Sequence, residues 1–81
     1  MKKLSLNIVS PEKEIYNGEV ESVTLPGMTG AFTILPQHAP IVSSLRAGKL
    51  TYVPVGGEKQ DLDIRGGFVE LSGGVVSACI D

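Results

Sequence analysis

Apolar and polar residues alternate along several short segments of the chain. At the N-terminus, Leu4, Leu6 and Ile8 are separated by polar residues. A period of two is typical of a β-strand that buries one face and exposes the other. We therefore expect half-buried strands here and in three segments with the same pattern, at 49–53, 61–65 and 76–80.

Glycine and proline divide the rest of the chain into short pieces. Ten glycines and five prolines leave little room for a typical helix of about 11–12 residues, whereas strands of about 5–6 residues fit between them. Gly73-Gly74 is expected at the tip of a two-residue hairpin, because both glycines tolerate positive φ. Gly56-Gly57 is expected at a similar tip, and Gly66-Gly67 separates two further strands. The pattern predicts an all-β fold with eight to ten strands, as two packed sheets or a flattened barrel, in a single domain over residues 1–81.

The alternation changes phase between residues 19 and 25. Val20 falls on one face of the expected strand, whereas Val23 and Leu25 fall on the other. A β-bulge would produce this change, and so would a strand that is buried on both faces.

Composition and charge exclude several classes of protein. Hydrophobic residues make up 42% and charged residues 20%, which is typical of a globular domain. The seven Lys and Arg residues are scattered and the net charge is -2, so no nucleic-acid partner is expected. No apolar run approaches the roughly 18 residues of a membrane span, so we expect no direct membrane insertion.

The N-terminus and the single cysteine bear on the compartment. Lys2 and Lys3 resemble the start of a secretory signal peptide, but Asn7 and Glu12 interrupt the apolar segment that should follow. Cys79 has no cysteine to pair with in this chain, which fits a reducing compartment. We therefore expect the protein to stay inside the cell.

The candidate catalytic residues lack partners. His38 is the single histidine and lies in a Pro-flanked turn, so we interpret it as a structural or interface residue. Cys79 is expected to behave as a small buried hydrophobic residue, and no Cys/His cluster has the spacing of a zinc site. Asp61 and Asp63 share one face of a predicted strand, which we interpret as solvated rather than as a carboxylate pair in a cleft. We expect no catalytic residue, no metal site and no cofactor.

The segment Gly27-Met28-Thr29-Gly30 resembles a phosphate-binding loop only superficially. A P-loop requires Lys followed by Ser or Thr and then a helix, but a strand-like segment follows here. Met28 is an apolar residue at the expected tip of this loop. Either a partner docks on it or the side chain folds back onto the sandwich.

Two longer segments carry a family resemblance. The residues V-E-S-V-T-L-P-G at 20–27 and G-A-F-T-I-L-P-Q-H-A-P at 30–40 resemble the epsilon subunit of rotary F-type ATP synthases. The segments 6–12, 45–50 and 64–70 are similar to the same family in the same order, so the resemblance covers essentially the whole chain.

The resemblance implies a ten-stranded β-sandwich in a non-catalytic subunit of the central stalk. In this family the domain binds the gamma subunit and the ring of c subunits, within the alpha/beta/gamma/delta/epsilon complex, and couples proton-driven rotation to ATP synthesis. The complex lies peripherally at the cytoplasmic face of the inner (plasma) membrane. By similarity, we expect Ser10, His38 and Ser43 to face gamma. The loop expected to face the c-ring consists of Pro26, Gly27, Met28, Thr29, Gly30, Ala31 and Phe32.

The chain departs from the family pattern in three ways. Ala31 stands where many members have an acidic residue, and Gln37 stands where a glycine usually precedes His-Ala-Pro. We therefore expect a more apolar ring contact, centred on Met28 and Ala31. The regulatory C-terminal helical hairpin of the family has no counterpart after Asp81, so we expect neither inhibition by an extended hairpin nor ATP sensing.

A biotinyl or lipoyl carrier domain is the alternative interpretation. Such domains are also small, all-β and glycine-rich, but they require a modified lysine at an exposed hairpin tip, which is flanked by methionines in biotinyl domains. Neither Lys49 nor Lys59 has this context.

Overall fold

The computed structural model describes residues 3–81, which form eight strands and no helix. The all-β prediction is confirmed, but the expected ten strands are eight. Eight lies within the range of eight to ten that the residue pattern predicts, and β2 is one long strand of 14 residues that serves both layers. The strands are β1 (Leu4–Val9), β2 (Glu14–Gly27), β3 (Gly30–Ile34), β4 (Ile41–Leu45), β5 (Gly48–Pro54), β6 (Gln60–Ile64), β7 (Gly67–Ser72) and β8 (Val75–Ile80).

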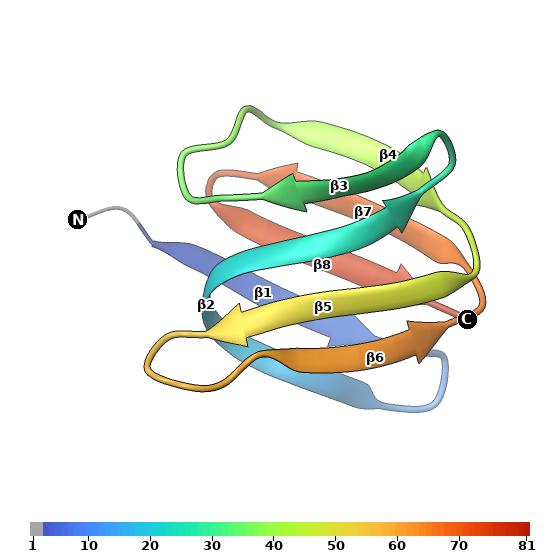
Figure 1. Ribbon diagram of the computed structural model, residues 1–81, viewed down its shortest axis with the longest axis horizontal. Coiled ribbons are helices and arrows are strands. Elements are labelled where there is room, and N and C mark those ends of the chain that lie inside the picture. Colours follow the sequence, from blue (N-terminus) through green and yellow to red (C-terminus); the bar gives the residue numbers. More distant parts are fainter. Residues whose placement is uncertain (1–2) are drawn as a thin grey trace.

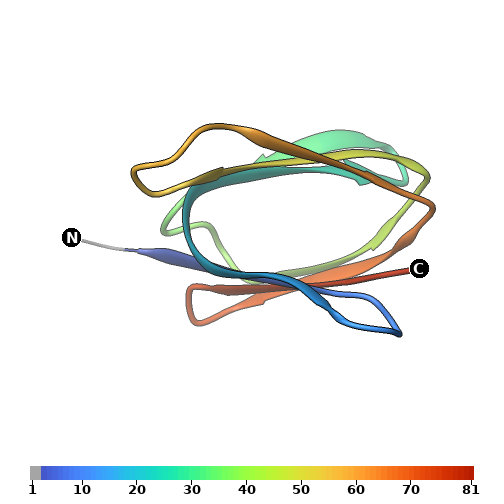
Figure 2. The same cartoon turned by 90° about the horizontal axis from the view of Figure 1, so that it is seen from below.

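The strands form two layers that share β2 (Figures 1 and 2). The rear layer of Figure 1 contains β4, β7, β8, β1 and the first half of β2. The front layer contains β3, the second half of β2, β5 and β6. All neighbouring strands are antiparallel except β1 and β8, which run parallel. Figure 2 shows β2 passing from one layer into the other, which joins the layers along one side of the sandwich.

The predicted change of phase in β2 is a β-bulge. Val20 pairs with Pro54 of β5 and Ser22 pairs with Val53, so Glu21 is an extra residue in the ladder. The extra residue lets Val20, Val23 and Leu25 all be buried although their spacing is irregular. The bulge lies where β2 crosses between the layers, since β2 pairs with β1 up to Val20 and with β5 beyond it.

The hydrophobic core fills the space between the two layers. Leu4, Leu6 and Ile8 are fully buried, as their alternation predicts. Tyr16 and Tyr52 pack at the border of this core with ring centroids 4.5 Å apart. Burial, and to a lesser degree the neighbouring Tyr16, raises the pKa of the Tyr52 phenol. The other buried hydrophobic residues are Val20, Val23, Leu25, Ile34, Leu45, Leu50, Ile64, Val69, Leu71, Val76, Ala78 and Ile80.

Two of the three predicted glycine turns have the expected form. Gly73 and Gly74 connect β7 to β8 as a two-residue hairpin, with φ of +59° and +78°. Arg65 and Gly66 connect β6 to β7, and Gly67 is the first residue of β7, where it pairs with Ile80. Gly56-Gly57 is not a two-residue tip, because residues 55–59 form a longer loop between β5 and β6.

The N-terminal segment is a strand rather than the apolar core of a signal peptide. Lys2 lies outside the described residues, and β1 begins at Leu4. Within residues 3–81, the structure contains no helix long and apolar enough to cross a bilayer.

Candidate functional site

The hairpin between β2 and β3 presents Met28 to solvent. Gly27 pairs with Gly30, so Met28 and Thr29 form a two-residue tip. The Met28 side chain is 60% exposed, so it does not fold back onto the sandwich. A Cβ atom on Gly27 would lie 2.8 Å from the Gly30 carbonyl oxygen and 2.9 Å from the Phe32 ring, so only glycine fits there.

The loop expected to face the c-ring divides into an anchor and a contact surface. Pro26 and Gly27 are buried, and the Pro26 carbonyl oxygen accepts a hydrogen bond of 2.9 Å from the Arg46 N–H. Residues 28–31 are exposed and Phe32 is half-buried. Any contact with a partner therefore falls on residues 28–32, while Pro26 and Gly27 hold the hairpin in place.

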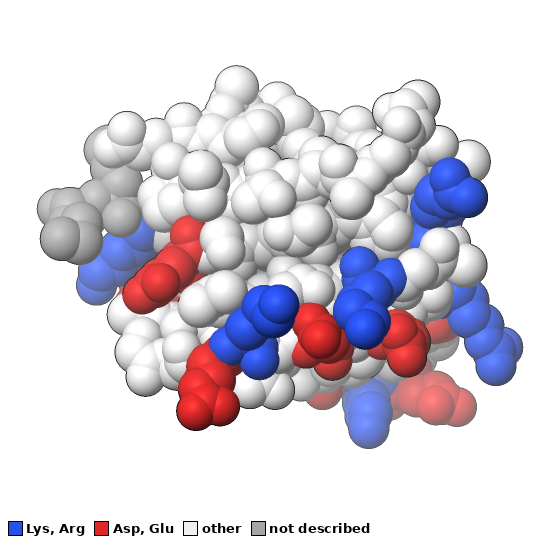
Figure 3. All heavy atoms as spheres, viewed as in Figure 1, with Lys and Arg blue, Asp and Glu red and all other residues white. Residues whose placement is uncertain are grey.

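No charged residue lies between Ser22 and Leu45. This stretch comprises the second half of β2, all of β3 and β4, and the two turns between these strands. Figure 3 shows the result on the front layer, where the surface over β3 and the end of β2 is uncharged and most Lys, Arg, Asp and Glu side chains gather over β5 and β6. The sequence analysis missed this signal, although the sequence alone contains it.

Ser10, His38 and Ser43 do not form one cluster. Ser10 closes the turn after β1, where its hydroxyl lies 3.2 Å from the Lys13 carbonyl oxygen. His38 lies at the other end of the sandwich, where it shares a hollow with Lys3 at the start of β1. His38 and Ser43 line a second groove together, whereas Ser10 is separated from them by about the length of β1, ~20 Å at 3.3 Å per residue.

The groove that His38 and Ser43 share runs between the edges of β3 and β4. We call it the seam groove; its volume is about 420 Å³. Its β3 side belongs to the loop expected to face the c-ring, and its β4 side includes two of the residues expected to face gamma. It is lined by Thr29, Gly30, Ala31, Phe32, His38, Ile41, Val42 and Ser43.

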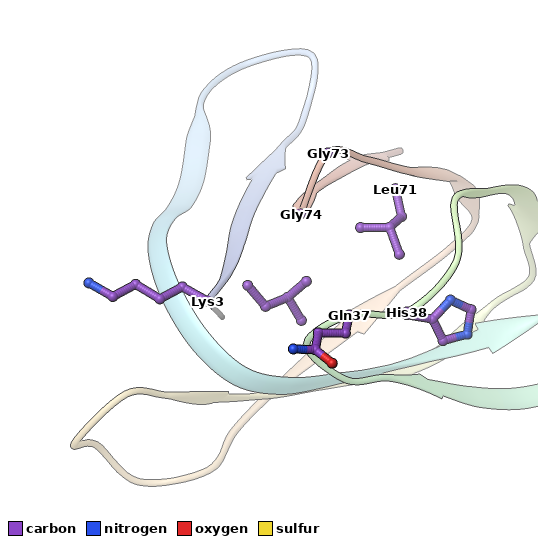
Figure 4. A pocket seen from close by; sticks show the side chains of 7 residues that line it. Lys3, Gln37, His38, Leu71, Gly73 and Gly74 are labelled. Carbon is purple, nitrogen blue, oxygen red and sulfur yellow. The ribbon is translucent and has the colours of Figure 1, made fainter. Parts of the chain in front are cut away.

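The hollow beside Lys3 has no arrangement that supports catalysis. It has a volume of about 460 Å³ between the start of β1, the β7–β8 turn and the β3–β4 turn. Figure 4 shows Leu71 directed into it and the Lys3 side chain directed away. Its titratable residues are His38 and Lys3, without a carboxylate or thiol that could form a nucleophile–base pair.

His38 is held by a strained turn. The Leu35 carbonyl oxygen accepts a hydrogen bond of 3.2 Å from the His38 N–H, and the His38 Nδ1 lies 2.7 Å from the Ala39 carbonyl oxygen. Gln37, at the third position of this turn, has a φ of 74° and is the single non-glycine residue with positive φ among the described residues. This geometry explains why glycine suits the position, because an L-residue with a Cβ is disfavoured there.

Replacing Gln37 by glycine is therefore expected to stabilise the protein by about 0.5–1 kcal/mol. Relief of the left-handed conformation, worth about 1–2 kcal/mol, exceeds the extra backbone entropy of glycine, about 0.5–1 kcal/mol. Thermal unfolding followed by circular dichroism measures the change, and a gain of a few degrees is expected. Gln60→Gly is the control: Gln60 lies in β6 with negative φ, so the same change should destabilise. A lower melting temperature for Gln37→Gly would contradict the prediction.

The strands β1, β4, β7 and β8 of the rear layer expose a nearly uncharged surface on the side away from the core, which we call the outer face; β2 borders it with the exposed Glu14 and Glu19, which pair with Val9 and Ser5. Val42 is 74% exposed and Phe68 is 50% exposed on it. Cys79, expected to be buried, is half-buried here because it pairs beside Phe68 and points away from the core side of β8. Glu70 is the one charged residue of the outer face, which consists of Ser5, Asn7, Val9, Val42, Ser44, Phe68, Glu70, Ser72, Val75, Ser77 and Cys79.

The carboxylates of the front layer are solvated. Asp61 is exposed, accepts a hydrogen bond of 2.9 Å from the Thr51 hydroxyl and lies 4.0 Å from Lys49 Nζ. Asp63 is also exposed. Within residues 3–81 no three His, Cys, Asp or Glu side chains gather closely enough to hold a metal ion.

Comparison with known proteins gives a consistent result. The family described as "ATP synthase, Delta/Epsilon chain, beta-sandwich domain" matches residues 3–81. An ATP synthase epsilon chain of Leptospira borgpetersenii is 42% identical over 79 residues, which are 98% of this chain and 61% of the relative. An epsilon chain of Caulobacter vibrioides is 44% identical over 71 residues, covering 88% of this chain and 81% of the relative. The chain thus spans about three fifths of the Leptospira protein.

Solved structures show the same fold. A chain in the mitochondrial ATP synthase of Euglena gracilis (OSCP/F1/c-ring) superposes with a TM-score of 0.91 at 26% identity, covering 99% of this chain and 51% of that one. A chain in the mitochondrial ATP synthase of Tetrahymena thermophila (central stalk/c-ring) superposes with a TM-score of 0.81 at 17% identity, covering 98% of this chain and 63% of that one. With the family match over residues 3–81, these findings show that the chain belongs to the family of ATP synthase delta/epsilon-chain β-sandwich domains.

Proposed function

We propose that residues 1–81 act as one domain of a non-catalytic epsilon subunit in the central stalk of an F-type ATP synthase. In this role the domain binds the gamma subunit and the c-ring, peripherally at the cytoplasmic face of the inner membrane, and helps to couple rotation to ATP synthesis. The observation that carries the proposal is the distribution of charge. The Met28 tip is uncharged and the outer face is nearly so, and both lie apart from the charged strands β5 and β6.

The outer face fits the gamma subunit best. A stable interface buries about 800 Å² per partner, roughly a sixth of the 4985 Å² surface of this domain. The outer face offers exposed apolar side chains at Val42, Phe68 and Val75. It also holds the Asn7 Oδ1 atom, which is buried without a hydrogen-bond partner in the described part of the chain. A donor from gamma could reach this oxygen only after the Asn7 side chain rotates toward the surface.

The residues expected to face gamma frame this surface. Ser10 follows β1 at one border of the outer face, and Ser43 and His38 belong to β4 and the turn before it, at the opposite border. β8 and β7 lie between them. The family resemblance and the exposed apolar residues therefore both favour the rear layer as the side that binds gamma.

The structure offers no support for ATP binding or for a carrier role. Five surface hollows of the described residues gather at most one Lys or Arg each, whereas a triphosphate needs several donors, so we propose that these 81 residues do not bind ATP. We also propose that they do not inhibit ATP hydrolysis. Lys49 lies within β5, and Lys59 directly precedes β6 instead of occupying a hairpin tip. A modified carrier lysine would need the tip position.

Phe68→Asp is expected to weaken binding to the gamma subunit at least about tenfold, because docking would bury an unpaired carboxylate. Phe68 is half exposed in the isolated domain, so the melting temperature should change little. Calorimetric titration with purified gamma subunit measures the affinity.

Val55→Asp is the matched control for this experiment. Val55 is similarly exposed but lies in the β5–β6 loop, outside both uncharged surfaces, so its replacement should leave the affinity unchanged. Equal affinities for the two variants would overturn the assignment of the outer face to gamma.

A further inference from the structure

β3 has a free edge with unpaired backbone groups. It pairs with β2 on one side and with no other strand among the described residues. The Pro26 carbonyl oxygen bonds to Arg46, away from β3, so the Pro26–Ala31 pair is not a hydrogen-bonded pair of the ladder. Because such pairs alternate in an antiparallel ladder, Ala31 and Thr33 both direct their N–H and C=O groups to the free edge.

The free edge of β3 lacks the protection that the opposite edge of the front layer has. β6 is that opposite edge, and it carries Asp61 and Asp63. Charged residues on an edge strand discourage pairing with other chains. β3 carries neither charge nor proline nor a bulge. Of the two edges of one sheet, one is protected and the other is open to strand addition.

The seam groove lies directly beside this edge. β4, on the far side of the groove, is joined to the front layer through a single pair, Gly27 and Leu45. Phe32 and Ile41 are half-buried along the groove and leave apolar surface open to solvent. Figure 2 shows that β2 crosses between the layers at one end of the sandwich, so the crossing does not cover the groove between β3 and β4. The sandwich is therefore open along β3 and β4.

We propose that β3 accepts an extended, uncharged segment of the gamma subunit as an additional strand. This inference rests on the proposed function. Alternate side chains of the added strand would be apolar and fill the seam groove against Phe32 and Ile41, and the others would be small or polar beside Ala31 and Thr33. Since this part of the domain is uncharged, a charged segment would be desolvated without a counter-ion.

The size of the edge argues against a second copy of this chain as the occupant. β3 has five residues, whereas a stable interface takes about 20–30 residues a side. A strand added to β3 is therefore stable only as part of a larger contact. Val42 and Ser43 of β4 connect the seam groove to the outer face, so one partner can occupy both.

Amide hydrogen exchange on the wild-type chain, free and bound to purified gamma subunit, tests the proposal. The N–H groups of Ala31 and Thr33 are expected to exchange at least about a hundredfold more slowly in the complex, because they become hydrogen-bonded. Exchange at Asp61 and Asp63, on the other edge, should not change.

The variant Thr33→Pro provides a second test of strand addition. It removes the outward N–H of β3 without breaking a bond to β2, since proline is tolerated at such edge positions. We expect at least about tenfold weaker gamma binding for this variant. Two controls should bind normally: Thr33→Ala keeps the N–H but loses the hydroxyl that lies 2.9 Å from Thr24 Oγ1, and Asp63→Pro makes the same backbone change on the β6 edge.

The outcomes separate this inference from the proposed function. Wild-type binding with unprotected amides at Ala31 and Thr33 would overturn strand addition and leave the docking of gamma on the outer face intact. Protection of these amides by self-association, or by c-ring without gamma, would also overturn it. Absence of any gamma complex would overturn both proposals. If Thr33→Pro does not fold, the exchange experiment on the wild-type chain still shows whether a strand is added to β3.

Discussion

Replacing Gly67 by alanine is expected to remove a large part of the stability of the domain. An alanine Cβ would overlap the Cys79 carbonyl oxygen and lie 2.9 Å from Ile80 Cα, and both obstacles are backbone atoms of β8 that cannot rotate away. The φ of +137° adds strain for any residue with a side chain. We expect a loss of more than about 4 kcal/mol, comparable to the total stability of about 4–12 kcal/mol for a domain of this length. Urea denaturation followed by circular dichroism measures it.

The variant Gly56→Ala distinguishes the effect of steric overlap on stability from the effect of a positive φ. Gly56 has a φ of +73° but no atom within 4 Å of the added Cβ. Its replacement should therefore cost only about 1–2 kcal/mol, the price of a left-handed residue. Similar losses for the two variants would show that the close approach of β7 and β8 at Gly67 is unimportant.

Met28→Asp is expected to reduce ATP-driven proton pumping several-fold in membranes that carry the assembled synthase. The Met28 side chain is 60% exposed at an uncharged tip, so a carboxylate there is harmless in the isolated domain. On docking against the c-ring it would lose water without gaining a partner charge, which is unfavourable. The melting temperature of the domain should therefore stay within a few degrees of the wild type.

Met28→Leu is the control for this prediction, because it keeps an apolar side chain of similar volume. It should pump like the wild type. Unchanged pumping by Met28→Asp would exclude a desolvated contact at the tip, and a large fall in its melting temperature would show a structural role for Met28.

Local patterns in the sequence predicted which residues are buried and where the chain turns. The alternation of Leu4, Leu6 and Ile8 follows from strand geometry, since successive side chains point to opposite faces. Gly73-Gly74 predicts a hairpin because few other residues adopt its backbone angles. The change of phase near Glu21 indicated either a bulge or a strand buried on both faces, and the structure shows the bulge. Each of these signals depends on neighbours within a few residues.

The candidate site was predictable only in part. The apolar tip at Met28 and the uncharged stretch from Ser22 to Leu45 are visible in the sequence, although the second was recognised only on the structure. The burial of Pro26 and Gly27 was not predictable, because it depends on packing against the distant turn at Arg46 and Gly48.

The sequence by itself thus determined an all-β chain with a two-faced pattern of burial and an apolar residue at a turn, whose exposure the structure decided. Tertiary structure decided how the strands associate: β2 continues through both layers as a single strand, and β1 lies parallel to β8 at the far end of the sequence. It also placed His38 and Ser43 beside the open edge of β3, with Ser10 far from them. Side-chain periodicity specifies which face of a strand is buried, but every strand offers the same backbone groups at both edges, so the choice of neighbour depends on how the whole core packs.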